Sequence, residues 1–179
     1  MTKTLQAIFE QSLTHRAEHS CGSYPYEHAD VLNILLKVLN AHNVLELGTG
    51  LGYTAAVMAS NNPTVHIDTI DKDSSHMEMA KKNWDELQIT PQITPYTEKA
   101  EDVLPQLTKQ YDLIFFDGYV PSMKFLIQFE KLLKKGGVLV TANMFLRDEK
   151  GGKYMRALQK ARKWQVATFS DTTIAYKLF

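Results

Sequence analysis

From residue 43 onward, short apolar runs typical of buried strands alternate with segments whose apolar residues recur at helical spacing. The connections between them are short, which predicts right-handed βαβ crossovers. Such crossovers build a mostly parallel sheet with helices on both faces. In chain order the segments are NVLEL, YTAAVMAS, VHIDTI, SSHMEMAKKNWDEL, PQITPY, AEDVLPQL, YDLIFFD, PSMKFLIQFEKLL and GGVLVTA. The predicted fold is therefore a doubly wound α/β domain.

The two ends of the chain extend this pattern. Residues 4–19 and 27–40 each place apolar side chains at helical spacing, so two helices should precede the first strand. After a further helix at about residues 152–163, the ending WQVATFSDTTIAYKLF predicts two strands around a turn at residues 170–172. We expect one domain over residues 1–179, with N-terminal helices in 1–41 and a Rossmann-like core in 42–179. Its sheet should have seven strands and close with an antiparallel C-terminal hairpin.

Composition limits the partners and the compartment. Twenty basic side chains balance twenty acidic ones in 179 residues, so no overall field draws the chain to nucleic acid or an anionic membrane. The single cysteine, Cys21, excludes an internal disulfide framework, and the start MTKTLQAIFEQ lacks the apolar run of a secretory signal. No apolar stretch approaches the roughly 20 residues that cross a bilayer. We expect a cytoplasmic protein with no membrane contact.

The segment VLELGTGLGYTAAVMA joins a predicted strand to a predicted helix through Gly48, Gly50 and Gly52. Small residues there let the backbone approach a ligand, and the helix amides beyond favour a carboxylate or phosphate. The loop predicts a polar or anionic cofactor, whereas the alternative is a tight turn without a ligand. A nicotinamide dinucleotide fingerprint would need a glycine at position 53, where this chain has Tyr53, so that cofactor is disfavoured.

Two carboxylates follow predicted strands. Asp71 could accept hydrogen bonds from both hydroxyls of a ribose, although it could instead cap the helix that starts near Ser74. Asp117, in YDLIFFDG, should point into the crevice at the carboxyl edge of the sheet, where it can face a cation. A solvent-facing Asp117 is the alternative.

Taken together, these motifs resemble those of class I S-adenosylmethionine methyltransferases, and most closely the catechol O-methyltransferase-like enzymes. The resemblance covers nearly the whole chain. It implies that Tyr53 and Thr54 hold the methionine carboxylate, that Ala100 and Glu101 lie by the adenine, and that Asp71 takes the ribose. The cofactor-binding set implied in this way is Glu46, Gly48, Thr49, Gly50, Gly52, Tyr53, Thr54, Asp71, Lys72, Ala100, Glu101, Asp117 and Gly118.

The chain departs from this family at the metal site. The family's magnesium ligands are an aspartate after strand four and an Asp-Asn pair after strand five, which correspond to Asp117, Ala142 and Asn143. Magnesium usually takes one or two carboxylates, so the missing one argues against a tightly bound metal unless Asp148 or Glu149 contributes.

The family's catalytic lysine is also missing. It stands three residues after the strand-four aspartate, where this chain has Val120, and the nearby Lys124 does not match the motif. The family's mechanism of metal and lysine therefore does not transfer whole.

The expected function is methyl transfer from S-adenosylmethionine to a small-molecule hydroxyl, although a nitrogen acceptor stays open. Asp117, Asn143 and Tyr119 are the candidate catalytic residues, with Tyr24 also lining the acceptor pocket. An RNA (tRNA) methyltransferase and a noncatalytic cofactor-binding protein are the alternatives, and a homodimer is open. The first alternative would use a basic helix face made of Lys153, Arg156, Lys160 and Lys163.

One further cluster has the residue types of zinc ligands. His15, His19 and Cys21 lie close in sequence, with the histidines one helical turn apart. No fourth ligand is evident, so the cluster is interpreted as part of a solvated helix face.

Overall fold

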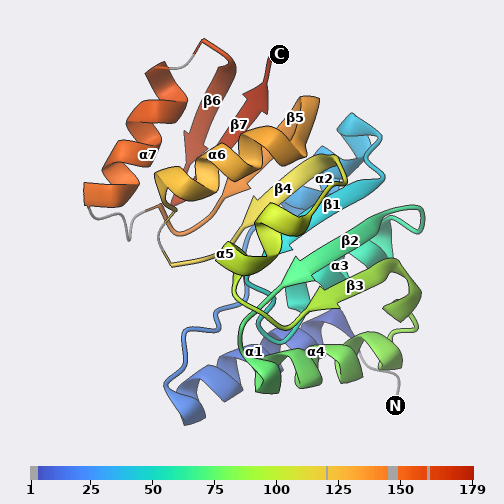
Figure 1. Ribbon diagram of the computed structural model, residues 1–179. Coiled ribbons are helices and arrows are strands. Elements are labelled where there is room, and N and C mark those ends of the chain that lie inside the picture. Colours follow the sequence, from blue (N-terminus) through green and yellow to red (C-terminus); the bar gives the residue numbers. More distant parts are fainter. Residues whose placement is uncertain (1–3, 120, 145–148, 161) are drawn as a thin grey trace.

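The computed structural model describes residues 4–119, 121–144, 149–160 and 162–179. Its strands form one seven-stranded sheet in the order β3-β2-β1-β4-β5-β7-β6 (Figure 1). The strands are β1 (Asn43–Leu47), β2 (His66–Ile70), β3 (Ile93–Tyr96), β4 (Tyr111–Phe116), β5 (Leu133–Thr141), β6 (Trp164–Phe169) and β7 (Thr172–Lys177). The first five pair in parallel, and β7 lies antiparallel between β5 and β6. The predicted doubly wound fold with a closing antiparallel hairpin is confirmed.

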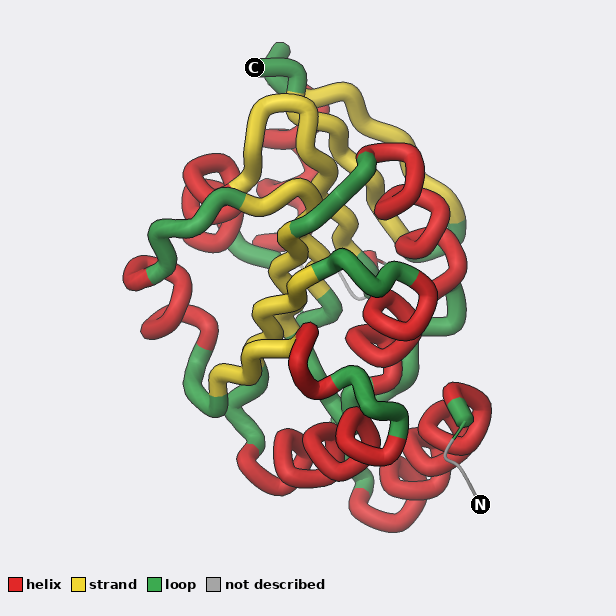
Figure 2. Tube along the Cα trace, turned by 90° about the vertical axis from the view of Figure 1, so that its right-hand side faces the viewer, coloured by secondary structure: helices red, strands yellow, loops and turns green. Residues whose placement is uncertain are grey.

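Helices cover both faces of the sheet (Figure 2). One face carries α1 (Leu5–His19), α2 (Ala29–Leu39), α3 (Tyr53–Asn61) and α4 (Ser74–Glu86), and the other carries α5 (Ala100–Val103), α6 (Met123–Leu132) and α7 (Glu149–Lys160). Neighbouring residues of a strand point to opposite faces, so Val44 packs with the first group and Leu45 with the second. The continuous apolar runs of the sequence follow from this burial on both faces. No described helix has the length and apolar character needed to cross a membrane.

Two helices differ in extent from the sequence expectation. The predicted helix AEDVLPQL is one α-helical turn, Ala100–Val103, continued by a 3-10 turn, Leu104–Gln106, that contains Pro105. Proline lacks the backbone N–H that an α-helix needs at that point. The last helix spans Glu149–Lys160 rather than about residues 152–163, so Lys163 lies beyond the predicted basic helix face.

The order of the strands determines where along the sheet a ligand-binding crevice is expected. β1 pairs with β2 on one side and with β4 on the other, so the direction of winding changes between β1 and β4. Crevices form at such switch points, at the carboxyl ends of the strands. The residues that follow β1, β2 and β4 therefore converge there.

The glycine loop is anchored from α4. Trp84, which is fully buried, donates its indole N–H to the Gly52 carbonyl oxygen (2.9 Å), and Asn83 donates its amide to the Leu51 carbonyl oxygen (2.9 Å). Gly52 has φ +81°, and a Cβ there would lie 2.5 Å from the indole nitrogen and 2.9 Å from the Ala80 Cβ. Glycine at this position is therefore a packing requirement of the fold.

Replacing Gly52 with alanine should lower the free energy of unfolding by about 2 to 4 kcal/mol, because the new Cβ combines left-handed strain with overpacking against Trp84. Gly22→Ala is the matched control, since a Cβ at Gly22 meets nothing within 4 Å. Urea unfolding followed by circular dichroism measures both, and equal stability of the two variants would contradict this account.

Candidate active site

Three adjoining cavities lie along the carboxyl edge of the sheet. The first, of about 880 Å³, is bounded by the residues after β1, β2, β3 and β4, and the second, of about 350 Å³, lies under the glycine loop. The third, of about 660 Å³, lies between residues 21–28 and the turn from β6 to β7. Gly48, Asp71 and Lys72 line both the first and the second, whereas Asp117 and Asn143 line both the second and the third. The cavities thus form one row.

The backbone at Gly48 holds the strand ends together. Its N–H donates to the Ile70 carbonyl oxygen (2.9 Å), and the Asp117 N–H donates to the Leu47 carbonyl oxygen (2.8 Å). Gly48 has φ +99°, and a Cβ there would lie 2.6 Å from the Asp117 carbonyl oxygen. No side chain fits between these two backbone segments, so glycine fixes the start of the loop against the end of β4.

Asp71 lies where the first and second cavities meet. Its carboxylate accepts hydrogen bonds from the Gly50 N–H (2.9 Å) and the Asp73 N–H (3.0 Å). Four lone-pair sites remain only partly used, so capacity is left for ribose hydroxyls. The alternative role of Asp71 as the helix cap is wrong, because Asp73 caps α4 through the N–H groups of Ser75 and His76.

The second cavity opens onto the start of α3. Tyr53 and Thr54 line it together with Thr49, and they lie at the end of the helix where the dipole and free amides favour a carboxylate. Phe9 of α1 packs edge-on against Tyr53, with ring centroids 5.2 Å apart. Burial, and secondarily the charge of Asp30, raise the pKa of the Tyr53 hydroxyl above its usual value.

Glu46 and Gly52 do not line the three cavities. Glu46 is fully buried in β1, and burial raises the pKa of its carboxyl to about 8. The Thr69 hydroxyl donates to Glu46 Oε2 (2.5 Å) and lies 2.6 Å from the Thr49 hydroxyl. Within the described part of the chain, Glu46 Oε1 has no hydrogen-bond partner. Glu46 is therefore connected to the second cavity by the hydrogen-bonded hydroxyls of Thr69 and Thr49, and Thr49 lines that cavity.

Ala100 and Glu101 line the first cavity, as do Lys72 and Gly118. Sequence reasoning missed Glu98 and Lys99, which immediately precede Ala100, and Lys153 of α7, which also lines this cavity. The first two flank a segment already singled out. The sequence analysis placed Lys153 on a basic helix face and not at this cavity, because only the tertiary fold brings α7 to this edge.

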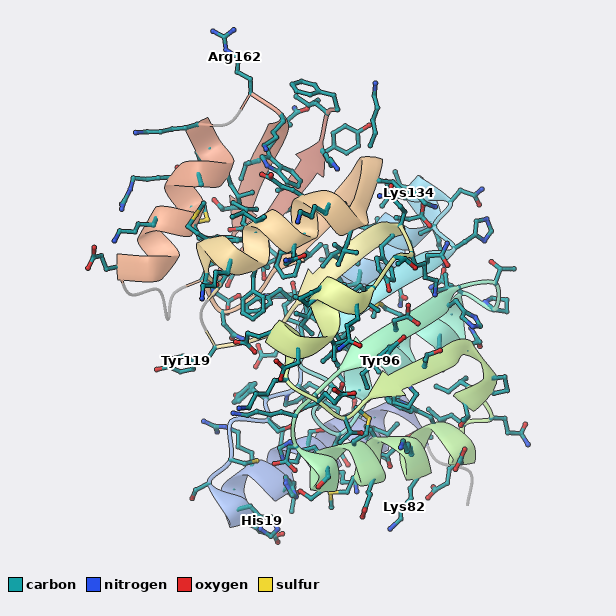
Figure 3. All side chains as sticks on the ribbon, viewed as in Figure 1. His19, Lys82, Tyr96, Tyr119, Lys134 and Arg162 are labelled. Atoms are coloured by element: carbon teal, nitrogen blue, oxygen red, sulfur yellow. The ribbon has the colours of Figure 1, made fainter. Side chains whose placement is uncertain are left out.

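Asp117 and Asn143 are joined directly: the Asn143 amide donates to Asp117 Oδ1 (2.7 Å). Burial, with a smaller repulsion from Asp171, raises the pKa of Asp117 to about 7, although the Asn143 hydrogen bond opposes the shift. Tyr119 projects outward from the loop after β4 and is 79% exposed (Figure 3). It lines the first and third cavities at their mouths.

The third cavity is lined by Tyr24, which the sequence analysis named for the acceptor pocket, and by Arg16, Tyr26 and Asp171, which it did not name. Arg16 of α1 lies over the Tyr24 ring, 4.7 Å from its centroid, and both line this cavity. Tyr26 and Asp171 line it as well, and the Tyr26 hydroxyl lies 2.9 Å from the Thr172 hydroxyl. Asp171 belongs to the turn between β6 and β7, so in sequence it indicates only a turn.

The residues at the family's magnesium positions do not fit that ion. Ala142 is buried and its backbone N–H donates to the Phe116 carbonyl oxygen (2.9 Å), so it brings no carboxylate. Asn143 presents its NH₂ group to Asp117, which leaves one carboxylate where a hard divalent ion favours more. Glu149 pairs with Lys153 (2.8 Å) on the outside of α7. Asp148 and Val120 lie outside the described residues.

Replacing Asp71 with alanine should weaken binding of S-adenosylmethionine by about 1 to 3 kcal/mol, because a charged acceptor at the junction of two cavities is lost. Isothermal titration calorimetry measures the change. Glu78→Ala, at an exposed position of α4, should leave the affinity unchanged. Equal affinity in both variants, or tighter binding of a nicotinamide dinucleotide, would refute the role of Asp71.

Comparison with known proteins identifies the family of the chain. Residues 3–166 match the family model described as O-methyltransferase. The chain is 32% identical over 151 residues to a catechol O-methyltransferase of Niastella koreensis, with 80% of this chain and 68% of that protein covered. It is also 43% identical over 54 residues to a tRNA1(Val) (adenine(37)-N6)-methyltransferase of a Flavobacteriaceae bacterium, which covers 30% of this chain and 23% of that protein.

A solved structure shows the same fold over the whole chain. The O-methyltransferase TomG from Streptomyces achromogenes, in complex with SAM, superimposes with a TM-score of 0.86 at 21% identity, covering 100% of this chain and 92% of that one. Because the family model spans most of the sequence, the resemblance seen in the glycine loop is confirmed, and the chain belongs to the O-methyltransferase family.

Proposed function

We propose that this O-methyltransferase transfers the methyl group of S-adenosylmethionine to a hydroxyl of a small molecule, with Asp117 as the acidic group of the site and without a bound divalent metal. The observation that carries the proposal is the position of Asp117. It lies on the boundary between the cavity under the glycine loop and the cavity beyond it, and Asn143 is hydrogen-bonded to it there.

The row of cavities suits the parts of the cofactor in order. Ala100 and Glu101 would hold the adenine in the first cavity, and Asp71 the ribose where the first two cavities meet. Tyr53 and Thr54 would hold the methionine carboxylate at the start of α3. This order leaves the third cavity for the acceptor.

When bound, S-adenosylmethionine supplies a methyl carbon activated by a sulfonium. The residues around the third cavity would hold the acceptor oxygen in line with that carbon, and most of the rate gain would come from this alignment and from exclusion of water. As the new C–O bond forms and the C–S bond breaks, Asp117 accepts the hydroxyl proton. In the protein without cofactor, burial raises the pKa of Asp117 to about 7, so the group is near its titration point at neutral pH.

A small molecule is favoured over RNA as the acceptor. Of the basic residues on α7 and just beyond it, Lys153 pairs with Glu149 and Lys163 pairs with Glu130 (2.7 Å). Carboxylates therefore offset part of the charge that a nucleic-acid surface would need. The similarity to a tRNA methyltransferase covers only 23% of that protein. A cytoplasmic location and a homodimer stay predictions.

The affinity for S-adenosylmethionine should depend on pH through Asp117. A cationic ligand favours the charged carboxylate, so affinity should be full above the pKa of about 7 and fall below it. Binding at pH about 6 should be roughly tenfold weaker than at pH about 8. Calorimetry of Asp117→Asn, which keeps the shape of the side chain, should show weaker binding with this pH dependence removed. An unchanged pH dependence in that variant would argue against the role of Asp117.

Methyl transfer should persist after treatment with EDTA and should not rise on addition of Mg²⁺, because the metal positions offer one carboxylate. Formation of S-adenosylhomocysteine with catechol as a trial acceptor measures this. Ala142→Asp should create a magnesium site detectable by calorimetry. Ala142→Asn should not, because asparagine has the size of aspartate but no charge. Activity that is lost on chelation and restored by Mg²⁺ would overturn the metal-free proposal and point to Asp148, Glu149 or Asp171 as a ligand.

A further inference from the structure

A group of side chains of the types that bind transition metals lies beside the second cavity. His15 of α1, Cys21 of the following loop and His76 of α4 place one ligand atom each within 4.8 Å of one another. The sequence brings His15 and Cys21 near each other, but His76 is 61 residues from His15 and only the fold adds it. We propose that these three side chains form a binding site for a zinc-type transition-metal ion, distinct from the acidic site at Asp117.

The geometry of the two histidines matches a tetrahedral ion. Their Nε2 atoms lie 3.2 Å apart and share a hydrogen bond in the metal-free protein, which a bound ion would replace. Two nitrogens bound to a tetrahedral Zn²⁺ at about 2.0 to 2.1 Å stand about 3.3 Å apart. The rings meet edge to face, with centroids 5.1 Å apart.

An acidic side chain lies beside one of the two histidines. Asp73 Oδ2 lies 3.9 Å from His76 Nδ1, on the ring nitrogen that does not face His15. This distance is too long for a hydrogen bond, but a negative charge on that side of the ring favours a cation bound at Nε2.

The local fold holds the three ligands on three separate elements. His76 lies in the first turn of α4, which Asp73 caps, and it is 7% exposed. α1 ends at His19, and Ser20 adopts a left-handed conformation, after which the chain passes Cys21. Among the described residues the group has three members, so a fourth coordination position would go to solvent. Two imidazoles and one thiolate are ligands that Zn²⁺ and Co²⁺ accept.

The site would form part of the wall of the second cavity. Cys21 and His76 line that cavity together with Gly50 and Thr54. A bound ion would therefore join α1, the loop that also lines the acceptor cavity, and the start of α4. His19, the other histidine of the sequence cluster, projects from the end of α1 into solvent (Figure 3).

Titration of the reduced, metal-free protein with Co²⁺ tests the proposal, because thiolate and tetrahedral coordination each give a distinct absorption band. We expect one Co²⁺ per chain, a thiolate-to-cobalt charge-transfer band, and displacement of Co²⁺ by Zn²⁺. Cys21→Ser should abolish the charge-transfer band, and His76→Gln should abolish stoichiometric binding. His66→Gln, at an exposed position at the opposite end of β2, should bind as the unaltered protein does.

A further variant distinguishes weaker metal binding from loss of folding. Asp73→Asn keeps a side chain that caps α4 but removes the charge beside His76, so it should weaken Co²⁺ binding about 2- to 5-fold. Circular dichroism of the metal-free variants checks that each is folded. Absence of the charge-transfer band in the unaltered protein, or its persistence in Cys21→Ser, would overturn the proposal.

Discussion

The contact on which the site depends is the close approach of two backbone segments, at Gly48 after β1 and at Asp117 after β4. A Cβ on Gly48 would lie 2.6 Å from the Asp117 carbonyl oxygen. This contact exists because β1 and β4 are parallel neighbours at the switch point of the sheet. It brings the glycine loop to the first acidic residue after β4, and so the second cavity to the third.

Two carboxyl groups near this contact have a raised pKa, because their surroundings disfavour the charged form. Glu46 is fully buried, and its pKa of about 8 means that it is mostly protonated at neutral pH. Asp117, with a pKa of about 7, is balanced between its two forms. A cationic cofactor shifts such a balance toward the carboxylate, so binding and proton release are coupled through the same residue.

Position 142, where the resemblance implies a second carboxylate for a metal, is an alanine in this chain. In the family to which the chain belongs, the resemblance implies a metal and a lysine at positions occupied here by Ala142 and Val120. Asn143 instead donates its amide to Asp117, so a side-chain hydrogen bond occupies the position at which the resemblance would place an ion. The same chain carries histidine and cysteine ligands elsewhere, between α1 and α4, where softer ions are favoured.

Sequence alone determined the doubly wound fold, the closing hairpin and the position of the glycine loop, because alternation of apolar runs and glycine spacing are local signals. Gly48, Asp71 and Asp117 could be picked out in the same way, since each directly follows a predicted strand. Tertiary structure alone decided which side chains meet across the chain: His76 with His15, Lys153 with the first cavity, and Asp171 with the third. It also decided that Asp73 rather than Asp71 caps α4, and that Glu46 lies behind the loop. These outcomes depend on packing between distant elements and on burial, which shifts pKa values, and neither is encoded in the spacing of neighbouring residues.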